Sequence, residues 1–142
     1  MAAKTEPAPS VKADVIGFGE QRAEVEAEMV DGGRFAEITD DAREKVSEAF
    51  ERMQTVLDGK ASMDELRQDD RVALLNDQEL INALLTQAKI DSRMVCKRER
   101  RVGSHRLTST CRTAAEWKRA SEKSREDIEY RRSLGDILPQ GE

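Results

Sequence analysis

Apolar side chains recur at helical spacing in several stretches of the chain, and glycines or capping motifs separate these stretches. The first predicted helix follows Gly17 and Gly19. It ends at the Asp-Gly-Gly of residues 31–33, because glycine accepts the left-handed conformation common at helix C-termini. Phe35 and Ile38 follow on a connecting segment, as apolar side chains expected to fill space in the core. The face of this helix is formed by Phe18, Val25, Met29 and the aliphatic stem of Arg22.

The second predicted helix has the most continuous apolar stripe. Thr39 or Asp40 can cap its N-terminus, where acidic side chains also favour the positive end of the helix dipole. Gly59 ends it. The stripe comprises Ala42, Val46, Ala49, Phe50, Met53, Val56 and Leu57.

A third helix is predicted from about Asp69 or Asp70 to Lys89, with an apolar face wide enough for burial between neighbours. A polar insert, Asn-Asp-Gln-Glu at 76–79, interrupts it, and Asn82 follows one turn later. Buried amide side chains must find hydrogen-bond partners. We therefore expect the insert to line a loop and bind its backbone, with a functional site as the alternative. The apolar face comprises Val72, Leu74, Leu75, Leu80, Ile81, Leu84, Leu85 and Ala88.

Two capping boxes mark further helix starts. Ser62 and Glu65 should satisfy each other's free amides at the start of a short turn of helix, and Thr113 and Glu116 should do the same for a last helix to about residue 132. The apolar stripe of this last helix is narrow. We expect it to be largely exposed and docked by Trp117.

Length and composition indicate one mainly helical domain. A chain of 142 residues is the size of a single domain, and 37% of its residues are charged whereas only 4% are aromatic. This mixture favours charged amphipathic helices around a thin core. The expected fold is mainly α, with three or four helices and one disulfide-pinned β-hairpin at 93–112. The predicted domain spans 14–132, between a disordered leader (1–13) and a flexible tail (133–142).

The hairpin is predicted from a symmetry in the residue numbers. Cys96 and Cys111 are equidistant from the Gly103-Ser104 pair, and glycine at the first central position suits a two-residue type II′ turn. Folding there sets the two cysteines opposite each other. A strict two-residue turn would place them at a hydrogen-bonded pair, where the strands lie further apart. A longer turn or a bulge would relieve this.

Two cysteines so placed are expected to form a disulfide, with free thiols as the alternative. A disulfide implies an oxidising compartment, and therefore the periplasm or secretion. The N-terminal residues 1–14 contain no apolar signal-peptide core. We expect either a mature exported chain whose signal peptide is absent or, as the alternative, a cytoplasmic protein.

The hairpin segment is strongly basic. Residues 93–113 contain seven basic side chains and one acidic one, whereas the whole chain carries −5. This cluster could bind an anionic partner. We favour the alternative that it packs on acidic helices of the same chain or lies on a solvated strand face, because base-stacking aromatic side chains are missing from the segment. The net negative charge disfavours nucleic acid, since phosphate attraction dominates such binding. The candidate binding residues are Lys97, Arg98, Arg100, Arg101 and Arg106.

No motif in the sequence specifies a reaction, cofactor or metal. Cys96, His105 and Cys111 could supply three metal ligands, but zinc-type spacing and a fourth ligand are missing. The Gly-Phe-Gly at 17–19 lacks the third glycine of a dinucleotide fingerprint, because Arg22 occupies its position. No catalytic residue is therefore predicted. No apolar run approaches the length of a membrane span.

One segment resembles a known module. Residues 93–117 contain Cys-x-Arg-Glu, Gly-Ser and Cys-x-Thr-x-x-Glu-Trp in order. This resembles an uncharacterised family of small secreted or periplasmic gammaproteobacterial proteins. The resemblance is strongest over 91–117 and extends over about 20–120, including the helix at 74–88. It implies export and a Cys96–Cys111 bridge, but no activity or cofactor. The matching residues are Cys96, Arg98, Glu99, Gly103, Ser104, Cys111, Thr113 and Trp117.

These observations give two expectations for function. The first is a non-enzymatic envelope or secreted protein that binds a protein partner through the basic hairpin. The alternative is a cytoplasmic nucleic-acid-associated protein that places Arg98, Arg100, Arg101 and Arg106 on phosphates. Nothing in the sequence indicates the identity of the partner or the oligomeric state.

Overall fold

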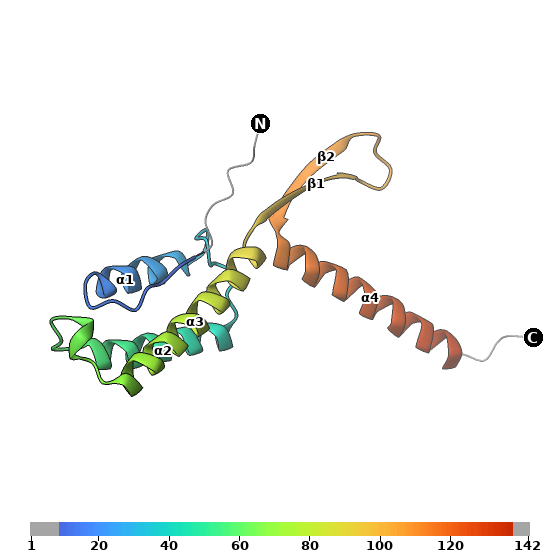
Figure 1. Ribbon diagram of the computed structural model, residues 1–142. Coiled ribbons are helices and arrows are strands. Elements are labelled where there is room, and N and C mark those ends of the chain that lie inside the picture. The colour runs from blue at the N-terminus through green and yellow to red at the C-terminus, as the bar shows by residue number, and fades with distance from the viewer. Residues whose placement is uncertain (1–8, 138–142) are drawn as a thin grey trace, which may run out of the picture. The chain divides into compact units, whose positions relative to one another are not determined.

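The structure, a computed structural model, describes residues 9–137. Over this range the predicted fold is confirmed: the chain is mainly helical and carries one two-stranded antiparallel hairpin with a disulfide between its strands (Figure 1). The elements are α1 (Phe18–Glu28), α2 (Asp40–Leu57), the 3-10 turn η1 (Met63–Glu65), α3 (Gln68–Asp91), β1 (Met94–Arg100), β2 (Leu107–Thr113) and α4 (Ala114–Ile137).

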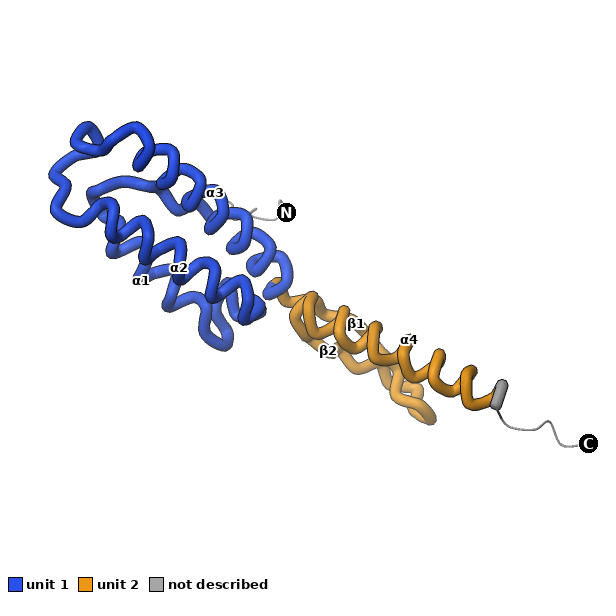
Figure 2. Tube along the Cα trace, turned by 90° about the horizontal axis from the view of Figure 1, so that it is seen from below, with its two compact units in different colours: residues 1–92 blue, residues 93–142 orange. Residues whose placement is uncertain are grey.

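The chain divides into two compact units with a boundary between Ser92 and Arg93 (Figure 2). Unit 1 contains α1, η1, α2 and α3, and unit 2 contains the hairpin and α4. The domain predicted over residues 14–132 spans both units. Each unit is described by itself.

Unit 1 holds a compact apolar core between its helices. Helix α2 lies alongside α3, and Val46, Phe50 and Met53 of α2 are completely buried. Phe18 of α1 meets the Phe50 ring edge-on, with 5.9 Å between ring centroids. The guanidinium carbon of Arg22 lies 5.9 Å from the same ring, so the expected role of Arg22 on the apolar face is confirmed. Burial of this apolar surface is the main source of stability for unit 1.

The segment before α1 is fastened to α3 by amide side chains. Asn82 accepts a hydrogen bond from the Val11 amide (2.7 Å) and donates one to the Val11 carbonyl (3.1 Å). Gln78 accepts from the Ala13 amide at 2.7 Å. The predicted loop-binding role is thus confirmed for Gln78 and Asn82, whereas Asp77 of the insert pairs with Arg52 instead. Val11 is buried, so this part of the predicted leader is ordered, whereas residues 1–8 lie outside the described range.

Helix α3 is buried along one stripe only, which corrects the prediction of burial between neighbours. Leu74, Ile81 and Leu85 face the core, but Val72 and Leu75 are each 53% exposed. In the described part of unit 1, α3 makes its extensive helix–helix contacts with α2. The apolar residues on its other side therefore remain at the surface.

The predicted helix caps are found at two places and differ at one. Thr39 accepts from the Ala42 amide at the start of α2. Thr113 and Glu116 form the reciprocal capping box of α4. At η1, however, the Ser62 side chain makes no cap hydrogen bond, and Glu65 accepts from the Ala61 amide instead. A single 3-10 turn is tighter than the α-helical turn to which the capping box is fitted.

Helix α4 is longer than predicted, since it continues to Ile137. Residues 133–137, assigned to the tail, belong to this helix, and residues 138–142 lie outside the described range. Every described side chain from 121 to 135 is exposed. Among residues 9–137, no helix is long and apolar enough to cross a membrane.

Candidate functional site: the basic hairpin

The register of the hairpin is the one predicted from the cysteine positions. Cys96 pairs with Cys111, and the ladder runs from Met94 opposite Thr113 to Arg100 opposite Leu107. Since both strands are seven residues long, the pairing is fixed over their whole length. The cysteine pair lies near the middle of the ladder, where a bridge clamps both halves of the sheet.

The turn is wider than the predicted two-residue turn at Gly103-Ser104. Residues 101–106 connect the strands, and the Ser104 amide donates to the Arg101 carbonyl at 3.0 Å. Gly103 is thus the third residue of a β-turn, where its φ of +84° is accessible to glycine. The symmetry of the cysteines determined the register but not the length of the loop.

The wider loop changes which strand pairs exchange hydrogen bonds. The Ala114 amide donates to the Arg93 carbonyl just beyond the sheet. Counting inward from this pair makes Cys96–Cys111 a non-hydrogen-bonded pair, where facing residues lie closest. Their Cα atoms are 4.0 Å apart and their sulfurs are bonded to each other. The longer turn thereby relieves the spacing conflict of a two-residue turn, and the predicted disulfide is confirmed.

One face of the hairpin rests on Trp117 of α4. The indole nitrogen donates to the Val95 carbonyl at 2.8 Å. The Lys97 ammonium lies 4.6 Å and the Arg112 guanidinium carbon 5.1 Å from the indole ring centroid. Both cations lie within the range in which an aromatic ring attracts positive charge. Trp117 therefore docks the hairpin on α4 as expected. The candidate binding residue Lys97 lies against the Trp117 ring and not on the opposite face of the hairpin.

The opposite face of the hairpin is open, and we call it the open face. Side chains alternate between the two faces along each strand, so every second residue counted from Cys96 or Cys111 lies on the open face. Leu107 pairs with Arg100 on this face and is 55% exposed. The open face comprises Met94, Cys96, Arg98, Arg100, Leu107, Ser109 and Cys111.

The arginines of the hairpin have no acidic partner in the described part of the chain. Arg98 and Arg100 are exposed on the open face, and Arg101 and Arg106 are exposed in the loop at 101–106, which we call the hairpin tip. None of the ion pairs found within residues 9–137 involves Arg98, Arg100, Arg101 or Arg106. Four guanidinium groups therefore point into solvent around one rigid strand pair. Such a surface can bind carboxylates or phosphates through paired hydrogen bonds.

The two units carry opposite net charges. Residues 1–92 contain 21 acidic and 11 basic side chains, a net charge of −10. Residues 93–142 contain 8 acidic and 13 basic side chains, a net charge of +5. The division in charge coincides with the division between the units. Long-range attraction for anions is therefore concentrated in unit 2.

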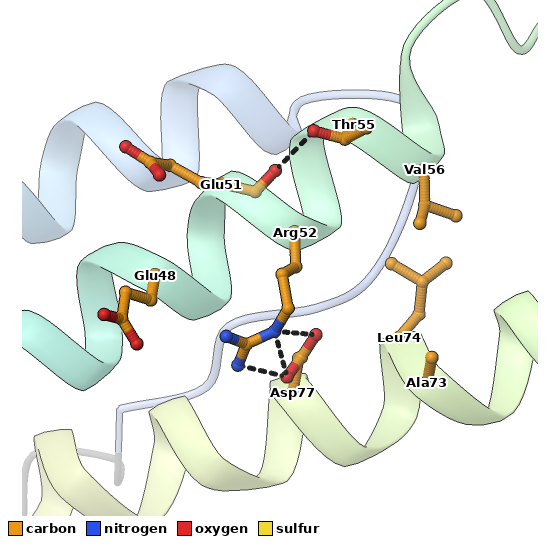
Figure 3. Close-up of a pocket in the computed structure, with 8 residues that line it drawn as sticks. All are labelled: Glu48, Glu51, Arg52, Thr55, Val56, Ala73, Leu74 and Asp77. Carbon is orange, nitrogen blue, oxygen red and sulfur yellow. Dashed lines mark hydrogen bonds and ion pairs between the residues drawn. The ribbon is translucent and has the colours of Figure 1, made fainter.

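A second surface feature lies in unit 1, in a groove between α2 and α3 (Figure 3). It has a volume of about 580 Å³. Arg52 reaches from α2 to α3 and donates to both carboxylate oxygens of Asp77, at 2.8 and 3.3 Å. This carboxylate raises the pKa of the Arg52 guanidinium above its ordinary value. The residues that line this acidic groove are Glu48, Glu51, Arg52, Thr55, Val56, Ala73, Leu74 and Asp77.

The sequence did not indicate the acidic groove. Its carboxylates lie at polar positions of helices whose apolar stripes were recognised, and Asp77 belongs to the polar insert that was expected to line a loop. The Arg52–Asp77 ion pair joins residues 25 positions apart on two helices. The helical spacing of Glu48, Glu51, Arg52 and Thr55 beside the buried stripe was a usable signal for one wall of the groove. The second wall depends on how α2 and α3 pack.

Cys96 and Cys111 are bonded to each other, so neither is a thiolate for catalysis or metal binding. In residues 9–137, no group of three potential metal-ligating side chains is found, and no polar or charged side chain is buried. Comparison with family models, with curated proteins and with solved structures finds no match to this chain.

Proposed function

We propose that this chain is a non-enzymatic protein of the bacterial envelope, or a secreted protein, that binds another protein through the open face and tip of its hairpin. We place it in the uncharacterised family of exported gammaproteobacterial proteins that its Cys…Gly-Ser…Cys segment resembles. The observation that carries the proposal is the combination of unpaired arginines with exposed apolar side chains on a covalently clamped strand pair.

The composition of the open face favours a protein partner. Arg98 and Arg100 alternate along β1 with side chains on the opposite face, while Met94 and Leu107 remain exposed beside them. Protein interfaces are enriched in arginine and methionine. Proteins that bind single-stranded nucleic acid usually stack bases on aromatic side chains, and the open face contains none.

Rigidity of the surface supports the same proposal. The disulfide and Trp117 hold the strands in one arrangement, so little conformational entropy remains to be lost when a partner binds. The disulfide also supports an oxidising compartment and hence the periplasm or secretion. A non-enzymatic role is supported by the absence of buried polar side chains among residues 9–137, because burial is a major cause of the altered pKa values of catalytic groups.

The proposal can be tested by photocrosslinking in intact bacterial cells. A photoreactive amino acid at Ser109 would lie on the open face, and one at Ser121 would lie on the exposed part of α4 as a matched control. We expect the Ser109 probe to capture a protein in the periplasm or medium. Charge reversal by R98E and R100E should abolish the capture, whereas R125E and R131E on α4 should preserve it.

A second measurement distinguishes the alternative function. Thiol titration of freshly isolated protein under denaturing, non-reducing conditions should find no free sulfhydryl. Two free thiols, together with salt-sensitive binding to duplex DNA or RNA that R98E and R100E abolish, would instead establish the cytoplasmic nucleic-acid-associated protein. Capture from the Ser109 and Ser121 positions alike would show that the open face has no special role.

A further inference from the structure

The acidic groove combines apolar side chains with three carboxylates and one cation, Arg52. Val56 and Leu74 face each other across the groove, and Arg52 spans it to Asp77 (Figure 3). Asp77 is only 14% exposed and is neutralised by Arg52. Glu48 and Glu51 are exposed, and neither forms an ion pair within residues 9–137. The groove therefore retains a net negative charge beside an apolar surface.

Such a groove matches an apolar side chain flanked by cations. A volume of about 580 Å³ accommodates a few side chains rather than a whole strand or helix. Ligand sites of this size usually pair an apolar floor with a small number of oriented polar groups. Glu48 and Glu51 would supply the acceptors for guanidinium or ammonium groups at the rim.

The hairpin tip of the same sequence has the complementary chemistry. Val102 is completely exposed at the end of the loop. Arg100 and Arg101 precede it directly, and Arg106 lies on the returning side of the loop. Val102 is the second residue of the β-turn in which the Ser104 amide donates to the Arg101 carbonyl, so its side chain is presented at the end of the loop.

Net charge reinforces this match over a longer range. The groove belongs to the unit with net charge −10 and the tip to the unit with net charge +5. Two copies approaching with a tip toward a groove attract each other, whereas tip-to-tip and groove-to-groove approaches repel. Electrostatics therefore selects one mode of self-association.

We propose that the acidic groove binds the hairpin tip of a second copy of this chain, with Val102 over Val56 and Ala73 and with the arginines beside Glu48 and Glu51. This inference rests on the proposed function, because it uses the hairpin as the contact surface. A single tip buries little area, so one contact is weak.

The experiment compares the mass of the full-length chain in solution at low and high salt. Sedimentation or light scattering should show concentration-dependent dimers at low ionic strength and monomers at about 0.5 M salt, where the Debye length is only a few ångströms. Reversal of the groove by E48R and E51R, or of the tip by R101E and R106E, should weaken dimerisation on the order of tenfold or more. The control reversals E20R and E24R on α1 and R125E and R131E on α4 should have little effect.

Mixing the two reversed chains gives the decisive observation. A basic groove on one variant and an acidic tip on the other should restore a one-to-one complex that neither variant forms with itself. The neutral pair E48Q and E51Q, checked for folding by circular dichroism, separates loss of charge from loss of structure. A chain that is monomeric at low salt, or dimers insensitive to both reversals, would overturn the inference. Capture of a different protein from Ser109 would then leave the proposed function intact.

Discussion

Trp117 is the residue that joins the two elements of unit 2. Its indole nitrogen binds the Val95 carbonyl, and its ring lies against the cations of Lys97 and Arg112. None of the residues described in unit 2 is buried, so few other contacts can replace these. Docking by Trp117 could be predicted because it is the only tryptophan and occupies the first turn of a helix that follows the hairpin.

Replacing Trp117 by leucine should loosen the hairpin without affecting unit 1. The change removes one hydrogen bond and two cation–ring contacts, a loss of about 1–3 kcal/mol in the stability of unit 2. Amide hydrogen exchange should accelerate in β1 and β2. The variant W117F keeps a ring but lacks the N–H donor, and it should show a smaller effect. Equal exchange rates in all three proteins would contradict the assigned role of Trp117.

Asn82 is a second residue with a definable contribution. It uses both its oxygen and its nitrogen on the backbone of Val11, so the segment before α1 is held on α3 from both sides of one residue. Replacement by alanine should lower the free energy of unfolding of unit 1 by about 1–2 kcal/mol, as two partly buried hydrogen bonds are lost. Urea unfolding measures this change.

The matched control for Asn82 is Asn76, an exposed amide on the same helix. N76A should change the urea midpoint little, whereas N82A should also make residues 11–14 more susceptible to proteolysis. Similar midpoints for N82A and N76A would show that the Val11 contacts are not needed for stability.

At the scale of elements, the register of the hairpin could be predicted from the sequence, whereas the length of its loop could not. Two cysteines symmetric about a point specify which residues face each other. They do not specify how many residues leave the ladder, because loops of different length share one centre. Hydrogen-bond parity was the physical constraint that pointed to a longer loop, and the non-hydrogen-bonded cysteine pair follows from it.

Removal of the disulfide should destabilise the hairpin selectively. Closing a loop of 15 residues contributes about 3 kcal/mol in the chain-entropy model. An isolated two-stranded sheet is only marginally stable in water. The C96S and C111S double variant should therefore lose the Trp117 environment seen by fluorescence, while α1, α2 and α3 keep their helical circular dichroism. Unchanged fluorescence would show that Trp117 docking alone holds the strands.

Helix α3 illustrates the opposite limit of sequence reasoning. Its apolar positions were identified, but periodicity does not reveal how many neighbours a helix has. Leu74 and Ile81 are buried against the rest of unit 1, whereas Val72 and Leu75 face outward. The acidic groove was missed for a related reason, since its two walls come from α2 and α3 and exist only once these helices pack.

At the scale of the whole molecule, the two units differ in what stabilises them. All sixteen buried apolar side chains of the described structure lie between residues 11 and 88. Unit 2 relies on a disulfide, strand pairing and one aromatic contact. Proteins with unlike parts of this kind need not unfold in a single two-state transition.

Unfolding of the intact chain should therefore show two separable transitions. The only tryptophan, Trp117, reports on unit 2, whereas far-ultraviolet circular dichroism is dominated by the helices of both units. The core variant F50A should destabilise unit 1 by about 3–5 kcal/mol, since it leaves a cavity at a completely buried position. It should shift the dichroism midpoint and leave the fluorescence midpoint in place. A common shift of both midpoints would show that the units unfold together.

The position of the disulfide also determines what happens when the backbone is cut. Arg101 and Arg106 lie exposed in the hairpin tip, and exposed loop tips are preferred targets of proteases. A trypsin-like cut after either residue falls between Cys96 and Cys111, so the two fragments remain covalently linked. The nicked protein keeps its mass on a non-reducing gel and separates into two bands only with reductant. Encounter with a protease thus leaves one connected molecule with two new chain ends at the tip of its hairpin.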